Sequence, residues 1–289
     1  MANARELDLT KQGLNWDIIG NPGGGKSHFA RTAVAWANAR GKKGVGLVSP
    51  RAEALSYAGA DFEYPDDYSD TDWNPGLKQF KTTMEAVAER EIAAWEKRDD
   101  IGVVVFDTMN AGPSEGIWRK VVAEAGTDDF TALGGNARQP YVTYASRMTR
   151  LMDRLDLLRW RKGCHVIKLW HQDVREFEGA GQARKESEKT ASGFKTVVHW
   201  DLAKLPELRG QIMRQSILKW SDVAFYAEPV EGSNPFRCKL IVLPDGTRMA
   251  KTRLPIIRAL QAPSQTFGSG AQDVPNEFGK LMQVVAGVK

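Results

Sequence analysis

The feature that most constrains this chain is a glycine-rich stretch that fills every position of the pattern G-x-x-x-x-G-K-[ST] directly after an apolar run, residues 16–19. Glycines let successive backbone N–H groups close around phosphate oxygens, because no Cβ stands in the way. The lysine places an ammonium against the β- and γ-phosphates, and the serine supplies a hydroxyl for Mg²⁺. The residues expected to bind the nucleotide are Asn21, Pro22, Gly23, Gly24, Gly25, Lys26, Ser27 and His28.

The residues on either side of this loop supply the structural context that the motif requires. Residues 27–40 are rich in alanine and end at Gly41, which predicts a helix whose positive N-terminal end faces the bound anion. ATP with Mg²⁺ is the expected ligand. GTP stays an alternative, although no guanine-reading N-K-x-D motif follows the next acidic strand.

That acidic strand is the second motif. Residues 101–108 contain five apolar residues, three of them β-branched valines, and bring an acid, Asp107, to the carboxyl end of the strand. This is a Walker B strand, and it predicts that Asp107 lies beside the glycine-rich loop at one edge of a sheet.

The rest of the chain alternates between strands and helices. Strands are expected at 45–50, 164–171, 221–227 and 237–243, helices at 76–98 and 141–161, and a mobile loop or hairpin at 172–196. The expected fold class is α/β: a mostly parallel twisted sheet with helices on both faces, ending in a C-terminal β-hairpin between 237–243 and 248–254. The expected division is an N-terminal extension at 1–13, a core at 14–260, and a linker with a short C-terminal helix at 261–289.

Composition narrows the class of protein further. No apolar run of about 18 residues is present, and the N-terminus lacks a signal-peptide profile, so a cytoplasmic protein without membrane contact is expected. Cys164 and Cys238 lie far apart without metal-like neighbours, which predicts two small apolar side chains rather than a disulfide or a zinc site. A net charge of +4 permits contact with nucleic acid but does not require it.

The order of these motifs resembles the RecA-core ATPases of phages, and within them the single-strand-annealing RecA-like ATPases related to RadA and to DnaB-type helicase motors. The resemblance covers roughly residues 14–257, and its specific part is the two Walker motifs. It implies a RecA-like P-loop NTPase in the cytoplasm of the phage's host. The motifs and segments that carry the resemblance are the glycine-rich loop, Glu53, Asp107-Thr108, His171, 205–208, 220–224 and 250–253.

The resemblance also implies roles for single residues. Asp107 would hold Mg²⁺ directly or through water, together with Ser27. Glu53 would polarise the attacking water, although it lies a few residues past its strand, and an exposed glutamate at a helix start is the alternative. His171 would be a sensor of the γ-phosphate, or else a hydrogen-bonded strand end. Lys251 and Arg253 would reach the γ-phosphate of a neighbouring subunit, or else be solvated charges on a hairpin.

These roles define the expected function. It is a Mg²⁺-dependent ATPase that oligomerises as a ring or filament and acts on single-stranded DNA in phage recombination or replication. In the 172–196 segment, cations would neutralise phosphates and Phe177 or Phe194 would stack on bases, although interleaved glutamates oppose this. The C-terminal segment could contact another phage replication or recombination protein. The alternatives are a P-loop kinase or phosphotransferase, and a nucleotide-dependent switch that recruits partner proteins.

Overall fold

The fold was analysed in a computed structural model of the chain. The residues that the structure describes are 12–65, 73–74, 79–80, 83–176, 184–190, 193–199, 202–206, 208–209, 217–230, 238–241, 251–254 and 274–286.

One large sheet forms the centre of the molecule. From β11 to β3 all neighbouring strands are parallel, and β12 adds an antiparallel edge. The strand β7 lies between the strand that leads into the glycine-rich loop and the Walker B strand. In spatial order the strands are β14 (Val274–Pro275), β12 (Cys238–Ile241), β11 (Val223–Pro229), β1 (Asn15–Gly20), β7 (His165–Glu176), β6 (Ile101–Asp107), β2 (Lys43–Val48) and β3 (Phe62–Glu63).

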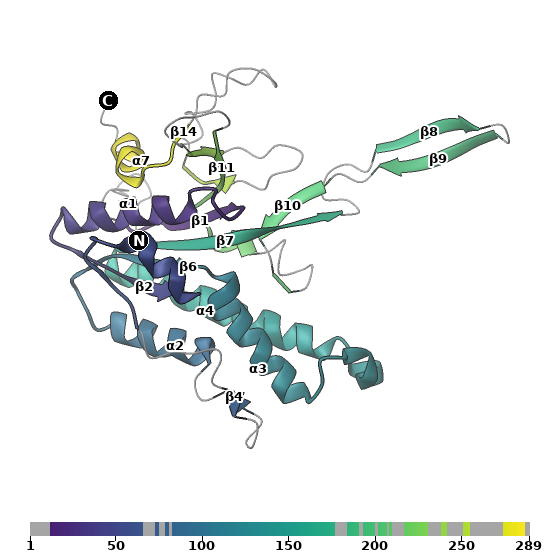
Figure 1. The fold of residues 1–289 in the computed structure, drawn as a ribbon, viewed down its shortest axis with the longest axis horizontal. Coiled ribbons are helices and arrows are strands. Elements are labelled where there is room, and N and C mark those ends of the chain that lie inside the picture. The colour runs from purple at the N-terminus through teal and green to yellow at the C-terminus, as the bar shows by residue number, and fades with distance from the viewer. Residues whose placement is uncertain are drawn as a thin grey trace, which may run out of the picture.

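Helices cover both faces of this sheet, as Figure 1 shows. On one face lie α1 (Lys26–Asn38) and α7 (Phe278–Val285), and on the other lie α2 (Met84–Trp95), α3 (Glu115–Ala125) and α4 (Gln139–Lys162). The side chains of β1 alternate between the two cores: Trp16 and Ile18 pack under α1, and Ile19 packs on the α4 side. The expected α/β fold class, a mostly parallel sheet with helices on both faces, is therefore confirmed.

The long helix α4 forms as its sequence pattern predicts. Its expected apolar face is buried, and the helix ends at Gly163, whose φ of +66° provides the left-handed C-terminal turn. The buried residues of that face are Tyr144, Met148, Leu151, Leu155 and Leu158.

The helix expected at 76–98 is shorter than predicted. Residues 79–80 form β5 (Gln79–Phe80), which pairs with β4 (Trp73–Asn74), and the helix begins only at Met84. The side-chain oxygen of Thr83 accepts a hydrogen bond from the N–H of Ala86 at 3.2 Å and caps the helix at that point.

Of the expected C-terminal hairpin between 237–243 and 248–254, residues 237 and 242–250 lie outside the described part of the chain. β12 pairs with β11 rather than with the following strand, and β13 (Lys251–Thr252) also pairs with β11. Both strands lie on the edge of β11 that β1 leaves open, β12 along 226–229 and β13 along 223–224. The free edge of β11 is long enough to take both strands in tandem, and this places β13 at the amino end of the sheet.

The segment expected to be a loop or hairpin after residue 171 forms an arm. β7 continues to Glu176 and pairs antiparallel with β10 (Leu202–Pro206), and beyond them β8 (Arg184–Thr190) and β9 (Gly193–His199) pair only with each other in the described part. Figure 1 shows this hairpin projecting far from the sheet. Phe177 lies outside the described residues. Among the described helices, none combines the length and the apolar character needed to cross a membrane.

Candidate nucleotide site

The glycine-rich loop joins β1 to α1 at the carboxyl edge of the sheet. Gly25 precedes α1 with a φ of +85°, and a Cβ at this position would lie 2.5 Å from both Asn276 Nδ2 and Cys238 Sγ. No side chain caps the helix, and its first turn contains no acid, so its first N–H groups can bind an anion. Asn21, Pro22, Gly23 and His28 are exposed at this loop, while Gly24 is buried.

Lys26 lies inside this loop. Its Nζ donates to the carbonyl oxygens of Gly20 and Asn21, at 2.9 and 2.7 Å, and the residue is 5% exposed. Burial lowers the pKa of Lys26 to about 8, and the nearby carboxylates of Asp107 and Glu53 oppose that shift. The ammonium is thus charged at neutral pH and lies next to two acids.

Asp107 ends β6 beside the loop and is 1% exposed. Burial raises its pKa to about 6, whereas the nearby hydroxyl of Ser27 and the hydrogen bond from Tyr57 favour its charged form. Its Oδ1 is buried and has no hydrogen-bond partner among the described residues. A buried carboxylate oxygen without a partner, close to a serine hydroxyl, fits a Mg²⁺ ion or a water bound to it.

Glu53 reaches the same edge by way of a 3₁₀ helix, η2 (Arg51–Tyr57), that follows β2. The glutamate is half-buried, and its charge raises the pKa of both Lys26 and Asp107. Its offset from the end of β2 therefore does not remove it from the site. This position supports Glu53 as the water-polarising residue, which remains a prediction.

His171 stands next to the loop, opposite Gly20 in the pairing of β7 with β1. Its backbone N–H donates to Asn110 Oδ1 at 2.6 Å, and its Nδ1 is buried with no partner among the described residues. Burial, followed by the charge of Lys26, lowers the pKa of the imidazole, so the ring is neutral at physiological pH. His171 is not the strand end, because β7 continues to Glu176.

Lys251 and Arg253 lie at the opposite edge of the sheet. Thr252 pairs with Val223 at the start of β11, and Val223 is level with Trp16 of β1, four residues or about 13 Å along the strand direction from Gly20 at about 3.3 Å per residue. The guanidinium of Arg253 lies 3.4 Å from Asp222 Oδ1 and donates to the carbonyl of Lys219 at 2.6 Å. These two contacts hold the guanidinium of Arg253 at the amino edge of the sheet, away from the glycine-rich loop of its own chain.

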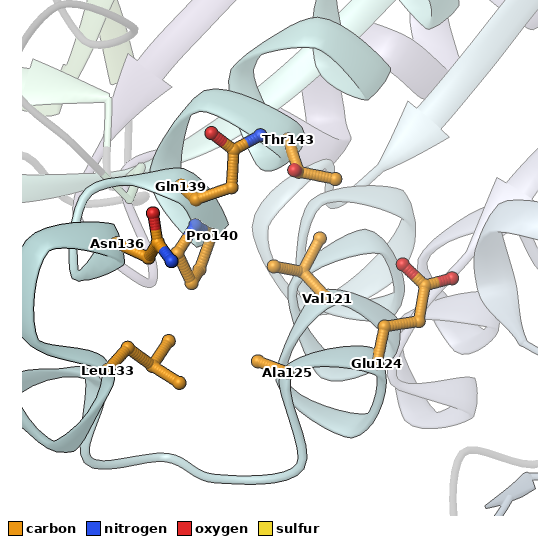
Figure 2. Close-up of a pocket in the computed structure, with 8 residues that line it drawn as sticks. All are labelled: Val121, Glu124, Ala125, Leu133, Asn136, Gln139, Pro140 and Thr143. Carbon is orange, nitrogen blue, oxygen red and sulfur yellow. The ribbon is translucent and has the colours of Figure 1, made fainter.

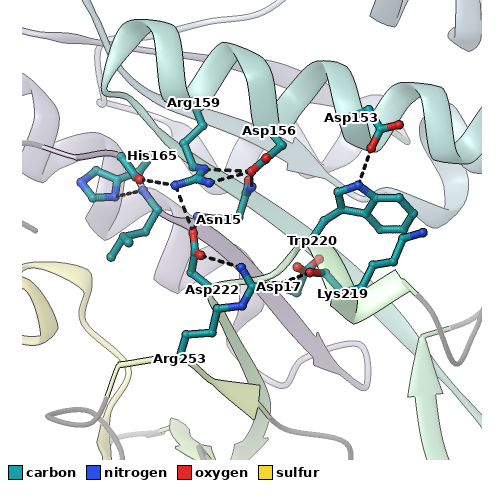
Figure 3. A network of polar contacts seen from close by, with 12 residues as sticks. Asn15, Asp17, Asp153, Asp156, Arg159, His165, Lys219, Trp220, Asp222 and Arg253 are labelled. Carbon is teal, nitrogen blue, oxygen red and sulfur yellow. Dashed lines mark hydrogen bonds and ion pairs between the residues drawn. The ribbon is translucent and has the colours of Figure 1, made fainter. Parts of the chain in front are cut away.

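Figure 3 shows the polar network that holds this far edge together. Arg159 of α4 donates to the carbonyl of Gly13 at 3.0 Å and lies 3.4 Å from Asp222 Oδ2, which also accepts the N–H of Asn15. The network joins α4, the start of β1 and the start of β11. Arg253 attaches β13 to it, so this arginine has a structural role within its own chain.

No protein-family model and no curated protein matches the sequence. Among solved structures, the chain is similar to a protein described as the RadB recombinase, with a TM-score of 0.39 and 14% sequence identity, covering 81% of this chain and 84% of that one. The fold assignment rests on the strand order and on the glycine-rich loop, not on this similarity.

Three residues of the site could not be predicted from sequence. Tyr57 contacts Asp107, which lies 50 positions away in the sequence. Asn276 donates a 2.8 Å hydrogen bond to the carbonyl of Gly25, which lies 251 positions away in the sequence. Cys238, expected to be a buried apolar residue, is half-buried and lies against Gly25. No motif marks these positions, because each contact depends on where a distant element packs.

A separate pocket of about 400 Å³ lies between α3, the 3₁₀ helix η4 (Phe130–Asn136) and the start of α4 (Figure 2). Its only charged lining residue is Glu124, which pairs with Arg147 at 2.8 Å. Among the described residues that line it, none is a cation and none belongs to the glycine-rich loop, so this pocket does not suit a triphosphate. The carboxyl edge of the sheet is therefore the site that fits a nucleotide.

Proposed function

We propose that this chain is a Mg²⁺-dependent ATPase with a RecA-like core, of the phage single-strand-annealing type, that acts on single-stranded DNA as an oligomer during recombination or replication. The observation that carries the proposal is that Lys26 and Asp107 lie at the same carboxyl edge of the sheet, near enough for each charge to act on the pKa of the other, while Oδ1 of Asp107 has no partner among the described residues. A Mg²⁺ ion held there would neutralise charge on the β- and γ-phosphates.

The chain's own residues divide the remaining work. The N–H groups at the start of α1 and the ammonium of Lys26 bind and orient the phosphates, and Ser27 and Asp107 hold the metal. Glu53 polarises the attacking water and the neutral imidazole of His171 contacts the γ-phosphate side. Two variants test these roles. Glu53→Gln and His171→Ala should each lower ATP turnover while leaving ATP binding unchanged.

Lys251 and Arg253 act between copies of the chain. Because they lie at the far edge of the sheet, any γ-phosphate that they reach belongs to a neighbouring copy, and Arg253 is 53% exposed for such a contact. Mixing two inactive variants tests this. Lys26→Ala subunits keep Arg253, and Arg253→Ala subunits keep an intact glycine-rich loop. An interface between the two variants therefore combines both groups, and we expect ATPase activity to return in the mixture. No recovery in mixed assemblies would remove the trans-acting role.

Single-stranded DNA is the proposed second ligand, bound along the β8–β9 arm. The arm leaves the sheet as a continuation of β7, whose residue 171 pairs with Gly20 of the glycine-rich loop. ATP turnover should rise when single-stranded DNA is added, DNA binding should weaken as salt increases, and Lys26→Ala should abolish turnover. If ATP turnover does not change when DNA is added and no salt-dependent DNA binding is found, a kinase or a nucleotide switch would be favoured instead.

A further inference from the structure

The two carboxylate oxygens of Asp107 have different surroundings. Oδ2 accepts a hydrogen bond from the hydroxyl of Tyr57 at 2.9 Å, whereas Oδ1 is buried with no partner among the described residues. Leaving a buried carboxylate oxygen unpaired is costly, so an unpaired Oδ1 indicates a ligand that is bound during function. The bond to Tyr57 determines which of the two oxygens is left for that ligand.

Tyr57 is built to be a permanent donor in this bond. The residue is 3% exposed, and its ring stacks on Phe62 with centroids 4.4 Å apart and 21° between the planes. A tyrosine hydroxyl carries one O–H donor, and here that donor is 2.9 Å from Oδ2. The stacked, buried ring thus fixes the direction of the hydrogen bond toward Oδ2.

Tyr57 also belongs to the same short helix as Glu53. Both residues lie on η2, which starts with the N–H of Glu53 donating to the carbonyl of Pro50 at 3.0 Å. Immediately after the helix, the carbonyl of Ala58 accepts from Arg31 of α1 at 3.1 Å. The hydroxyl of Tyr57 is thus the link between the helix that carries Glu53 and the acid at the end of β6.

We propose that Tyr57 is a positioning residue for the magnesium site: its hydroxyl engages Oδ2 of Asp107, leaves Oδ1 for the metal, and holds the Glu53 helix against the end of β6. This inference rests on the proposed function, because it assumes that Asp107 serves a nucleotide-bound metal. It adds Tyr57 to the residues of the proposed site and assigns a different partner to each carboxylate oxygen of Asp107. Tyr57 itself touches neither nucleotide nor metal.

The test is Tyr57→Phe, which removes one hydroxyl and keeps the stacked ring. Calorimetry measures the affinity for ATP in EDTA and again in saturating Mg²⁺. We expect the affinity in EDTA to be unchanged and the strengthening by Mg²⁺ to fall roughly tenfold, about 1.4 kcal/mol, as for loss of a hydrogen bond to a charged group. The Mg²⁺ concentration for half-maximal turnover should rise in parallel.

Tyr144→Phe is the matched control. Tyr144 is also buried, and its hydroxyl shares a 2.7 Å hydrogen bond with Ser114, but it does not contact Asp107. This variant should keep the wild-type response to Mg²⁺. A double-mutant cycle with Asp107→Asn adds a second measure: once Asp107 is replaced, Tyr57→Phe should have no further effect on Mg²⁺-dependent affinity.

The outcomes separate this inference from the proposed function. If Tyr57→Phe keeps the wild-type response to Mg²⁺, or loses the same affinity in EDTA as in Mg²⁺, the positioning role is wrong while the nucleotide site stands. If the wild-type protein binds ATP equally with and without Mg²⁺, both are wrong.

Discussion

At the scale of single residues, burial decides how the ionisable groups of this protein behave. The same desolvation that lowers the pKa of Lys26 to about 8 raises that of Asp107 to about 6. It lowers the pKa of His165, deep in the core under α1, to about 3. Sequence predicted where the glycine-rich loop lies between its strand and its helix, but it could not predict these shifts, because each depends on how completely other elements cover the group.

The glycines of the loop differ in what a side chain would meet, and this gives a matched pair of variants. Gly23 and Gly25 both have φ near +80°, but a Cβ at Gly23 meets nothing within 4 Å, whereas one at Gly25 meets Cys238 and Asn276 at 2.5 Å. Gly23→Ala should cost about 1 kcal/mol of unfolding free energy from backbone strain alone. Gly25→Ala should cost more and should also abolish ATP binding, as denaturant unfolding and calorimetry would show.

His165 makes folding stability depend on pH. Its Nδ1 accepts hydrogen bonds from the N–H of Leu14 and from Trp16 Nε1, so the folded state holds it neutral. Because the unfolded chain binds a proton near pH 6.5 and the folded chain only near pH 3, acidification favours unfolding in that window. Between pH 6.5 and pH 5, protonation of this histidine in the unfolded chain should lower the free energy of unfolding by about 2 kcal/mol.

His165→Asn is the variant that measures this, since its amide oxygen can accept the same hydrogen bonds. Its unfolding free energy should fall less steeply with acidification than that of the wild type. His28→Asn replaces an exposed histidine and should leave the slope unchanged. Equal slopes in wild type and His165→Asn would contradict the assignment.

At the scale of elements, α7 shows how a short helix stabilises a distant one. Phe278 is fully buried, and its ring lies 5.1–5.7 Å, centroid to centroid, from the rings of four other residues. Its N–H donates to Thr32 Oγ1 of α1 at 3.0 Å. The four surrounding rings belong to Trp16, Phe29, Trp36 and His165.

Removing this ring should weaken the whole fold. Phe278→Ala leaves a large cavity beneath α1 and should lower the unfolding free energy by about 3–5 kcal/mol. Gln283→Ala, at an exposed position of the same helix, should stay within about 0.5 kcal/mol of the wild type. A loss below about 1 kcal/mol for Phe278→Ala, by urea unfolding, would show that α7 is not part of the stable core.

The elements also show where sequence reasoning stops. Local rules predicted the strand, loop and helix around Lys26 and the 24-residue helix α4, because capping and periodicity act over a few residues. The predicted turn at 244–246 lies outside the described residues, and no local signal predicted that β12 and β13 would both pair with the open edge of β11. The contact between Tyr57 and Asp107 exists only because the η2 helix folds back after β2.

At the scale of the whole molecule, the β8–β9 arm branches from the paired strands β7 and β10. Leu202 is the cross-strand partner of Glu176, so residues 177–201 leave and return between two facing backbone positions. A two-residue Asn-Gly turn closes such an antiparallel pair. Replacing 177–201 by Asn-Gly should therefore leave the core folded and able to hydrolyse ATP.

The same replacement should remove stimulation by single-stranded DNA. Turnover with and without DNA, together with DNA binding by fluorescence anisotropy at two salt concentrations, measures this directly. If DNA still stimulates the shortened protein as it does the wild type, the arm is not the DNA-binding element. Circular dichroism of the shortened protein serves as the control for folding.

The contacts that Cys238 and Asn276 make around Gly25 have a consequence for the synthesis of the protein. When residue 171 has emerged from the ribosome, the growing chain already contains Lys26, Asp107 and His171. Cys238 and Asn276, which lie against the glycine-rich loop, have not yet been translated. We expect nascent chains that are stalled on a C-terminal extension to capture ATP only when the extension is long enough for residue 276 to leave the exit tunnel.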